Sequence, residues 1–239
     1  MESIALDQME EVNLMHRVDT KFYFHERLLA NILKSVERDY YILEINGERL
    51  MPYESVYYDT DNLQMLKWHQ NGKRNRFKIR KRKYLISNQT YLEVKKKNNK
   101  GITEKIRRIN GVDLDEDRNF ISDNTPFCWL ELNHVISNRF NRIMLVNKNM
   151  KERVSIDLNL EFFKDNDARK VEKLVLLEIK SERHLGMTEL QRSLKFLHIY
   201  PSGFSKYITG MYMFNDRLKF NRFKRRFLRV NKTIEKALL

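Results

Sequence analysis

Five cationic side chains alternate along one short segment of the chain, residues 74 to 82. They are Arg74, Arg76, Lys78, Arg80 and Arg82. Because successive side chains of a β-strand point to opposite faces, these five would share one face, and Phe77 and Ile79 would lie on the other. A solvated face usually mixes both charge signs. The segment therefore has two readings: a solvated basic face, or a surface that binds anions.

Other segments repeat the separation of charged from apolar faces. The expected strands at residues 16–24, 89–97, 102–109 and 174–182 each place charged side chains at alternate positions. On their polar faces stand Arg17, Asp19, Lys21 and Tyr23; Tyr91, Glu93, Lys95 and Lys97; Thr103, Lys105 and Arg107; and Glu178, Lys180 and Glu182. Repetition in several strands favours an anion-binding surface built from the whole sheet.

The composition supports a polyanionic partner. The chain of 239 residues has 46 Lys and Arg against 32 Asp and Glu, a net charge of +14. Such a field favours nucleic acid, anionic lipid or phosphate-rich small molecules. The single cysteine, Cys128, excludes an internal disulfide and a multi-cysteine metal site. We recognise neither a signal peptide nor an apolar run that could span a bilayer, so we expect a cytoplasmic setting.

The order of the elements predicts an α+β fold. At least seven strands are expected, several joined by short turns, which is typical of an antiparallel sheet. Helices are expected over 26–38, 187–198 and 204–216, and over 113–137 with a break near Pro126. Because these helices need an apolar surface, they would cover the outer face of the sheet. We therefore predict a closed antiparallel β-barrel, a tunnel of about eight strands with a polar, basic lumen and helices packed outside.

A series of ordered motifs adds a resemblance. RVDTKF, SVYYDT, KIRKRKY, LEVKKK, TEKIRRI, FNR, ERVSIDLNL, LLEIK and FSKY follow one another between about residues 16 and 214. In this order they resemble the VTC domain, the catalytic module of polyphosphate polymerases and a relative of the triphosphate tunnel metalloenzymes (the CYTH superfamily). The resemblance implies transfer of the ATP γ-phosphoryl group to a growing inorganic polyphosphate chain, with Mn²⁺ or Mg²⁺ as cofactor. The partners it implies are ATP and polyphosphate.

The resemblance also implies roles for individual residues. Phosphate-binding cations would be Lys21, Arg80, Arg82, Lys95, Lys105, Arg142, Arg153 and Lys206, with Ser205 contacting phosphate and Glu178 as the metal ligand. We expect the catalytic set to be Lys21, Arg80, Arg82, Arg153 and Glu178. The strand alternation adds Arg76, Lys78 and Arg107 to the phosphate-binding set, and either Lys105 or Arg107 matches the family's lysine.

Some positions depart from the wider superfamily or stay open. Two alternating glutamates before a lysine are usual there, whereas Arg17 and Asp19 precede Lys21 here. This favours the polymerase branch over a triphosphatase. Asp157 and Glu182 could be second metal ligands or ion-pair partners of neighbouring cations, and Glu93 is open in the same way.

Three alternatives to a polymerase remain: an RNA- or polyanion-binding barrel without catalysis, a polyphosphate-binding module, and a triphosphate hydrolase of the same superfamily. Specific nucleic-acid binding is not expected. Tyrosines near the cations could stack on a base or simply pack in the sheet; they are Tyr57, Tyr58, Tyr84 and Tyr91.

We divide the chain into a tunnel domain, residues 1–216, and a basic amphipathic C-terminal helix, residues 217–239. Phe220, Phe223, Phe227 and Val230 recur there at helical spacing among many Lys and Arg residues. This helix could lie peripherally on an anionic membrane, bind a membrane-protein partner, or cover one mouth of the barrel.

Overall fold

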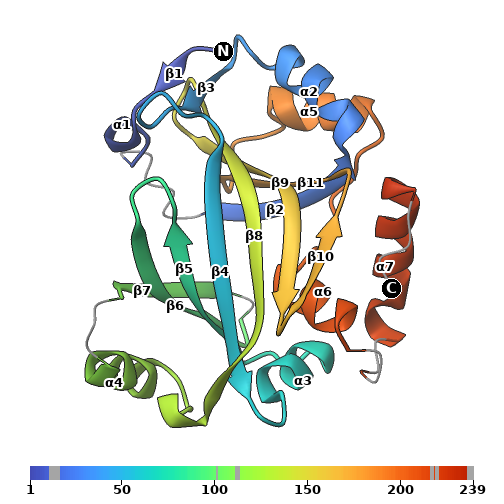
Figure 1. Ribbon diagram of the computed structural model, residues 1–239. Coiled ribbons are helices and arrows are strands. Elements are labelled where there is room, and N and C mark those ends of the chain that lie inside the picture. The colour runs from blue at the N-terminus through green and yellow to red at the C-terminus, as the bar shows by residue number, and fades with distance from the viewer. Residues whose placement is uncertain (11–16, 101, 111–113, 216–217, 219–220, 236–239) are drawn as a thin grey trace.

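A curled sheet, seen in Figure 1, has a main path of eight antiparallel strands in the order β2-β11-β9-β8-β4-β5-β6-β7. Along the chain these strands are β2 Arg17–His25, β4 Met51–Thr60, β5 Arg76–Tyr84, β6 Gln89–Lys97, β7 Thr103–Ile109, β8 Leu132–Asn147, β9 Glu152–Lys164 and β11 Leu174–Glu182. Three shorter strands pair at its margins: β1 Ser3–Ile4, β3 Tyr40–Leu43 and β10 Asp167–Val171. The computed structural model describes residues 1–10, 17–100, 102–110, 114–215, 218 and 221–235.

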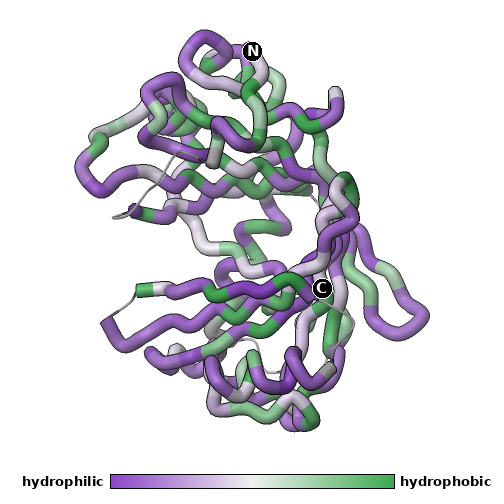
Figure 2. Tube along the Cα trace, turned by 90° about the vertical axis from the view of Figure 1, so that its left-hand side faces the viewer, coloured by the Kyte–Doolittle hydropathy of each residue, from purple (hydrophilic) through white to green (hydrophobic). Residues whose placement is uncertain are grey.

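The sheet has the shape of a half-barrel. Its path starts at β2 and ends at β7, and no pairing in the described part of the chain joins these two strands. In Figure 2 the two arms of the trace meet on one side and stand apart on the other. The expected antiparallel sheet of about eight strands, with a basic interior and outer helices, is confirmed. The described strands curl without closing.

Several of the helices cover the convex face, because the apolar side chains of the strands point outward there. The helices are α1 Leu6–Glu10, α2 Leu29–Ser35, α3 Gln64–Gln70, α4 Leu114–Asn124, α5 Glu189–Phe196, α6 Lys206–Met213 and α7 Asn221–Ile234, with 3₁₀ turns η1 Glu26–Leu28 and η2 Trp129–Glu131. Helices α2 and α5 bury Ile32 and Leu190 in one cluster with Leu177 of β11. Helices α3 and α4 bury Met65 and Ile121 in another cluster, against β5 and β6. Burial of this apolar surface is the main force that fixes the curl.

Helix α6 packs against the concave side instead. The ring of its Tyr207 stacks on Tyr57 of β4 with the centroids 5.4 Å apart. A Cβ on Gly210 would lie 2.7 Å from Phe162 and 2.9 Å from Ile136. Glycine therefore allows the helix to approach the strands this closely. As a result α6 fills one end of the curl, where β2 ends and β5 begins.

Helix α7 packs at this same end. Its Phe223, Phe227, Val230 and Ile234 are buried in the large core cluster that also contains α6. The ring of Phe223 lies 5.8 Å from that of His69 on α3. We call this end of the curl the α7 end, and the opposite end, where β2 begins and β5 ends, the α1 end. The apolar side of α7 is therefore packed on the protein itself.

Two sequence-based expectations concern this region. A helix is present within the predicted segment 217–239, but the proposed boundary at residues 216 and 217 lies outside the described residues. In the described part of the chain, no helix is long and apolar enough to cross a membrane.

Candidate active site

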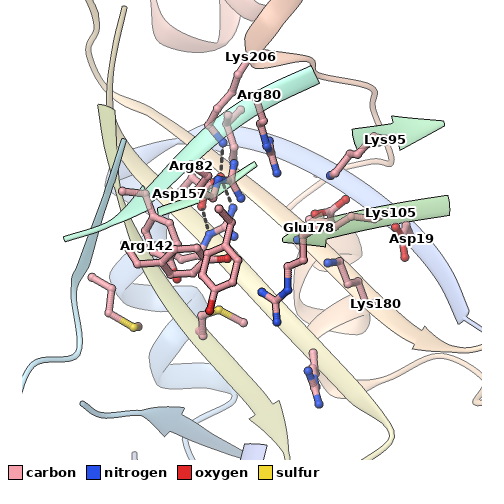
Figure 3. Close-up of a pocket in the computed structure, with 18 of the residues that line it drawn as sticks. Asp19, Arg80, Arg82, Lys95, Lys105, Arg142, Asp157, Glu178, Lys180 and Lys206 are labelled. Atoms are coloured by element: carbon pink, nitrogen blue, oxygen red, sulfur yellow. Dashed lines mark hydrogen bonds and ion pairs between the residues drawn. The ribbon is translucent and has the colours of Figure 1, made fainter. Parts of the chain in front are cut away.

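A cavity of about 540 Å³ lies inside the curl. This is within the usual range for small-ligand sites. Figure 3 shows charged side chains converging on it from several strands and from α6. The cations that line it are Arg17, Lys21, Lys78, Arg80, Arg82, Lys95, Lys105, Arg107, Arg142, Arg153, Lys180 and Lys206, and the carboxylates are Asp19, Asp157 and Glu178. The wall therefore carries a large excess of positive charge.

Three lysines lie side by side across neighbouring strands. Lys78 of β5 pairs in register with Lys95 of β6, and Lys95 pairs with Lys105 of β7. Like charges directly opposite each other destabilise a sheet. Nothing about folding requires such a row, which concentrates positive charge on one wall of the cavity.

Burial and neighbouring positive charges lower the pKa of each lysine in this row. Burial and the neighbouring Lys21 and Arg76 lower the pKa of Lys78 to about 7. Arg80 and burial hold the pKa of Lys95 well below its usual value. Burial also lowers the pKa of Lys105, to about 8, although Glu93 opposes the shift. An anion bound here would favour the protonated form of all three side chains.

Glu93 lies on the same face of β6 as Lys95, one alternation along the strand, and is fully buried. Its Oε2 accepts a 2.7 Å hydrogen bond from Nε of Arg80, and Lys105 Nζ lies 2.5 Å from its Oε1. Burial would raise its pKa, but Arg80, Arg82 and Lys105 hold that pKa far below its usual value. Of the two roles that the sequence left open for Glu93, metal ligand or ion-pair partner, the structure shows an ion pair that holds Arg80 and Lys105 in place.

Asp157 fulfils the same task on the opposite wall. It accepts a bidentate pair of hydrogen bonds from Arg142, at 2.6 and 2.9 Å, and a further one from Lys206. Burial alone would raise its pKa, but Arg142 and Lys206 hold the pKa well below its usual range. Of the two roles weighed from the sequence, ion pairing describes Asp157 in this structure.

Glu178 contacts Lys21, its direct neighbour across β2 and β11. Burial would raise its pKa, but Lys21 and Lys180 lower it to about 2. The next pair on the same face of these strands is Asp19 with Lys180. Glu178 therefore stays ionised and faces the cavity, beside cations on both strands.

No cluster of three metal-binding side chains occurs in the described ranges. The donor set nevertheless fits one mode of binding. Mg²⁺ is often held by one or two carboxylates together with phosphate oxygens and water. Glu178, with Asp19 nearby on β2, could take part in such a set when phosphate is present. The residues fit a metal that enters with its phosphate ligand.

The start of α6 brings two further groups to the cavity. Ser205 precedes the helix, and its hydroxyl accepts hydrogen bonds from the backbone N–H of Ile208 and from Lys78 Nζ, the latter at 3.2 Å. The next residue, Lys206, contacts Asp157 and lies with its Nζ 4.0 Å from the centre of the Phe140 ring. Helix α6 thus links the lysine row to the opposite wall.

The α1 end of the cavity differs in character from the rest. Apolar and aromatic side chains line it: Leu6, Met9, Ile45, Tyr84, Ile86 and Tyr91. The rings of Tyr84 and Tyr91 meet edge to face, 5.4 Å apart. Apolar and aromatic side chains therefore gather at the α1 end on one side of the cavity, while Arg17, Arg153 and Lys180 reach the same end from β2, β9 and β11.

All the site residues expected from the sequence line the cavity, except Arg76. Arg76 lies one alternation beyond Lys78, at the α7 end of β5. Arg17, Asp19 and Lys180 also line the cavity but were not among the expected site residues. The strand alternation already places them on the polar faces, which was the signal that could have found them. Tyr58, in contrast, packs outside against Trp129, so of the two roles weighed for this tyrosine packing describes it.

Comparison with known proteins agrees with this geometry. The family model of the VTC domain matches residues 16–121 and 129–215, and the chain belongs to this family. No curated protein matches it by sequence.

Several solved structures are similar. A candidate adenylate cyclase from Vibrio parahaemolyticus is 11% identical, with a TM-score of 0.48, over 81% of this chain and 98% of that one. A candidate adenylyl cyclase from Hippeastrum with a dominant triphosphatase activity is 13% identical, with a TM-score of 0.48, over 83% and 96%. The PH1819 protein from Pyrococcus horikoshii is 13% identical, with a TM-score of 0.47, over 82% and 95%.

Proposed function

We propose that this protein is a polyphosphate polymerase, which transfers the γ-phosphoryl group of ATP to the end of an inorganic polyphosphate chain. The observation that carries the proposal is the lysine row of β5, β6 and β7, facing a cavity of about 540 Å³. A row of cations inside a confined cavity suits a thin polyanion, whereas a nucleic-acid duplex needs an open basic surface. Phosphoryl transfer requires mainly positioning and charge neutralisation, which such a wall supplies.

The proposal gives each part of the cavity a role. The adenine base would lie in the apolar part at the α1 end, against Tyr84 and Tyr91. The phosphates would lie further towards α7, where Lys21, Arg80 and Arg82 would hold them, and Arg153 would approach them from the α1 end. The acceptor end of the polyphosphate would lie beyond, beside Lys206.

The terminal phosphate of the acceptor is already ionised and would need no general base. A divalent cation, Mn²⁺ or Mg²⁺, would neutralise charge on the reacting phosphates, with Glu178 and bound phosphate as its ligands. Ion pairs at Glu93 and Asp157 would keep the surrounding cations in fixed positions, so that little reorganisation is needed during transfer.

The experiment is incubation with ATP and Mn²⁺, followed by separate measurement of ADP, orthophosphate and long-chain phosphate. We expect ADP together with a chain that grows. Orthophosphate in place of a chain would support a triphosphate hydrolase instead, and no turnover with tight polyphosphate binding would support a binding module.

Variants assign the activity to the cavity. Arg82→Gln and Glu178→Gln should each lower chain synthesis by at least about tenfold, the effect of losing one charge-assisted contact. Arg74→Gln is a matched control, because Arg74 precedes the same strand but is exposed. Equal losses in all three variants would contradict the assignment.

Contact with a membrane remains a prediction and is restricted to charge. With its buried apolar residues packed on the core, α7 can offer a membrane its outer side, which includes Lys224, Arg225 and the exposed Leu228. We still expect a cytoplasmic setting. Co-sedimentation with vesicles containing anionic lipid, at low and at high salt, tests this contact.

A further inference from the structure

A second group of cations lies at the α7 end, beyond the residues that line the cavity. Arg76 and Lys97 are direct cross-strand neighbours on β5 and β6. They occupy the same face as Lys78 and Lys95, one alternation further out. The basic interior of the sheet therefore continues past the cavity to the end of the strands.

Helix α7 adds an arginine to this group. The Arg226 guanidinium lies over the ring of Phe223, 5.3 Å from its centre, and fits against Gly203. A Cβ at Gly203 would lie only 3.2 Å from Arg226 Cζ. A glycine at this position thus leaves room for the guanidinium beside the segment that leads to Ser205.

Electrostatics place these groups close together. His69 of α3 contacts Phe223 of α7 through its ring. Burial, followed by Lys78, Arg76, Arg226 and Lys97, lowers the pKa of His69 to about 2. Arg226 and Ser205 line one small cavity, and Ser205 accepts a hydrogen bond from Lys78. Arg226 therefore lies near the end of β5 where Arg76 and Lys78 stand, in keeping with the effect of all four cations on this imidazole.

We propose that Arg226, together with Arg76 and Lys97, forms a second anion-binding site at the α7 end, which holds the part of a phosphate chain that extends beyond the cavity. This rests on the proposed function and goes beyond it, because it assigns the C-terminal helix a part in substrate binding. The tyrosine pair Tyr84 and Tyr91 at the α1 end suits the nucleoside, and the chain would therefore leave at the opposite end. A guanidinium group binds two oxygens of one phosphate, so Arg226 and Arg76 can each hold one phosphate of the chain.

The test compares a short and a long ligand on the full chain. Binding of inorganic tripolyphosphate and of inorganic polyphosphate of several tens of units is measured by calorimetry, without ATP. Arg226→Gln should weaken binding of the long chain about three- to tenfold, as expected for one partly exposed charge contact, and leave tripolyphosphate binding unchanged. Arg226→Lys should restore part of the loss. The matched control is Arg225→Gln: both arginines are exposed on α7, but it is Arg226 that lies over Phe223 and against Gly203.

Each outcome decides between the proposals. If the unmodified protein binds both ligands and Arg226→Gln changes neither, the second site is wrong and the proposed function stands. If Arg226→Gln weakens both ligands equally, or Arg225→Gln matches its effect, the second site is also wrong. If the unmodified protein binds neither ligand, the proposed function fails together with it.

Discussion

Tyr207 on α6 donates a hydrogen bond from its phenol to the buried carboxylate of Asp59 at the end of β4. The same carboxylate accepts hydrogen bonds from the backbone N–H groups of Met65 and Leu66, at 2.9 Å each. Asp59 thus joins the first turn of α3 to α6. Because Tyr207 directly follows Lys206, this contact also fixes where the Lys206 ammonium enters the cavity.

Tyr207→Phe should therefore destabilise the fold and disturb the site. A buried carboxylate that loses a partner costs about 1 to 3 kcal/mol of unfolding free energy. Urea denaturation measures this loss, and tripolyphosphate binding should weaken at the same time because Lys206 is less well positioned. Tyr200→Phe is the control, since Tyr200 is 59% exposed. A Tyr207→Phe variant as stable as the control would contradict this role of Asp59.

Glu93→Gln should separate folding from binding. Removing the charge between Arg80 and Lys105 breaks a buried ion pair, so we expect a loss of about 2 to 4 kcal/mol in unfolding free energy. The cavity becomes more positive, so tripolyphosphate should raise the Tm of the variant by more than it raises that of the unmodified protein. Thermal unfolding with and without this ligand measures both effects. Glu54→Gln, which affects a surface pair with Arg139, should change neither quantity much. An equal or smaller ligand-induced shift in Glu93→Gln would contradict the prediction.

Much of the fold follows from alternation along the strands. In β5 and β6 one face is charged and the other aliphatic, so the sequence alone assigns the direction of each side chain. Strand β3, Tyr40–Leu43, was not predicted, because it is short and mostly buried and lacks a polar face. The expectation of helix through residue 137 was wrong from Leu132 onward, where β8 begins. Leu132, Val135 and Ile136 have helical spacing, but pairing with β4 and β9 overrides it.

The sequence predicts which residues line the site, but not which of them form ion pairs with one another. Alternation identifies which cations face inward. It cannot tell that Asp157 binds both Arg142 and Lys206, because the register between β8 and β9 and the position of α6 are set by tertiary packing. The role of Gly203 beside Arg226 was equally hidden, since α7 follows that glycine by many residues and is placed by its apolar side.

Phosphate binding should weaken as the pH rises from 7 to 9. The pKa of Lys78 is about 7 and that of Lys105 about 8 in the free protein. Bound phosphate raises both values, so binding above pH 7 takes up protons, and the affinity falls by up to about tenfold per pH unit for each lysine involved. Calorimetry of tripolyphosphate binding at pH 8, in two buffers with different ionisation enthalpies, counts these protons.

The lysine contribution is isolated by Lys78→Met, which should take up fewer protons, whereas Lys67→Met, at an exposed position of α3, should match the unmodified protein. An affinity that stays level or increases between pH 7 and 9 would show that the lysine row does not bind the phosphate.

Lys95→Gln should make the protein more stable and less active. Lys95 lies between Lys78 and Lys105, and Arg80 and burial hold its pKa well below the usual value. The unfolded chain therefore binds the proton more readily than the folded one, and at neutral pH this difference costs stability. Removing the ammonium should raise the Tm by about 2 to 4 °C, which corresponds to about 1 kcal/mol in a chain of this size. The gain should shrink as the pH approaches 10.5, where the unfolded state also loses the proton.

Chain synthesis from ATP should fall in the same variant, since a phosphate-binding cation is lost. Lys96→Gln, on the opposite face of β6, is the matched control and should leave synthesis unchanged. Were Lys95→Gln to lower both the Tm and the activity, the lysine would be a structural residue, and the idea that the sheet gives up stability to bind phosphate would have to be abandoned.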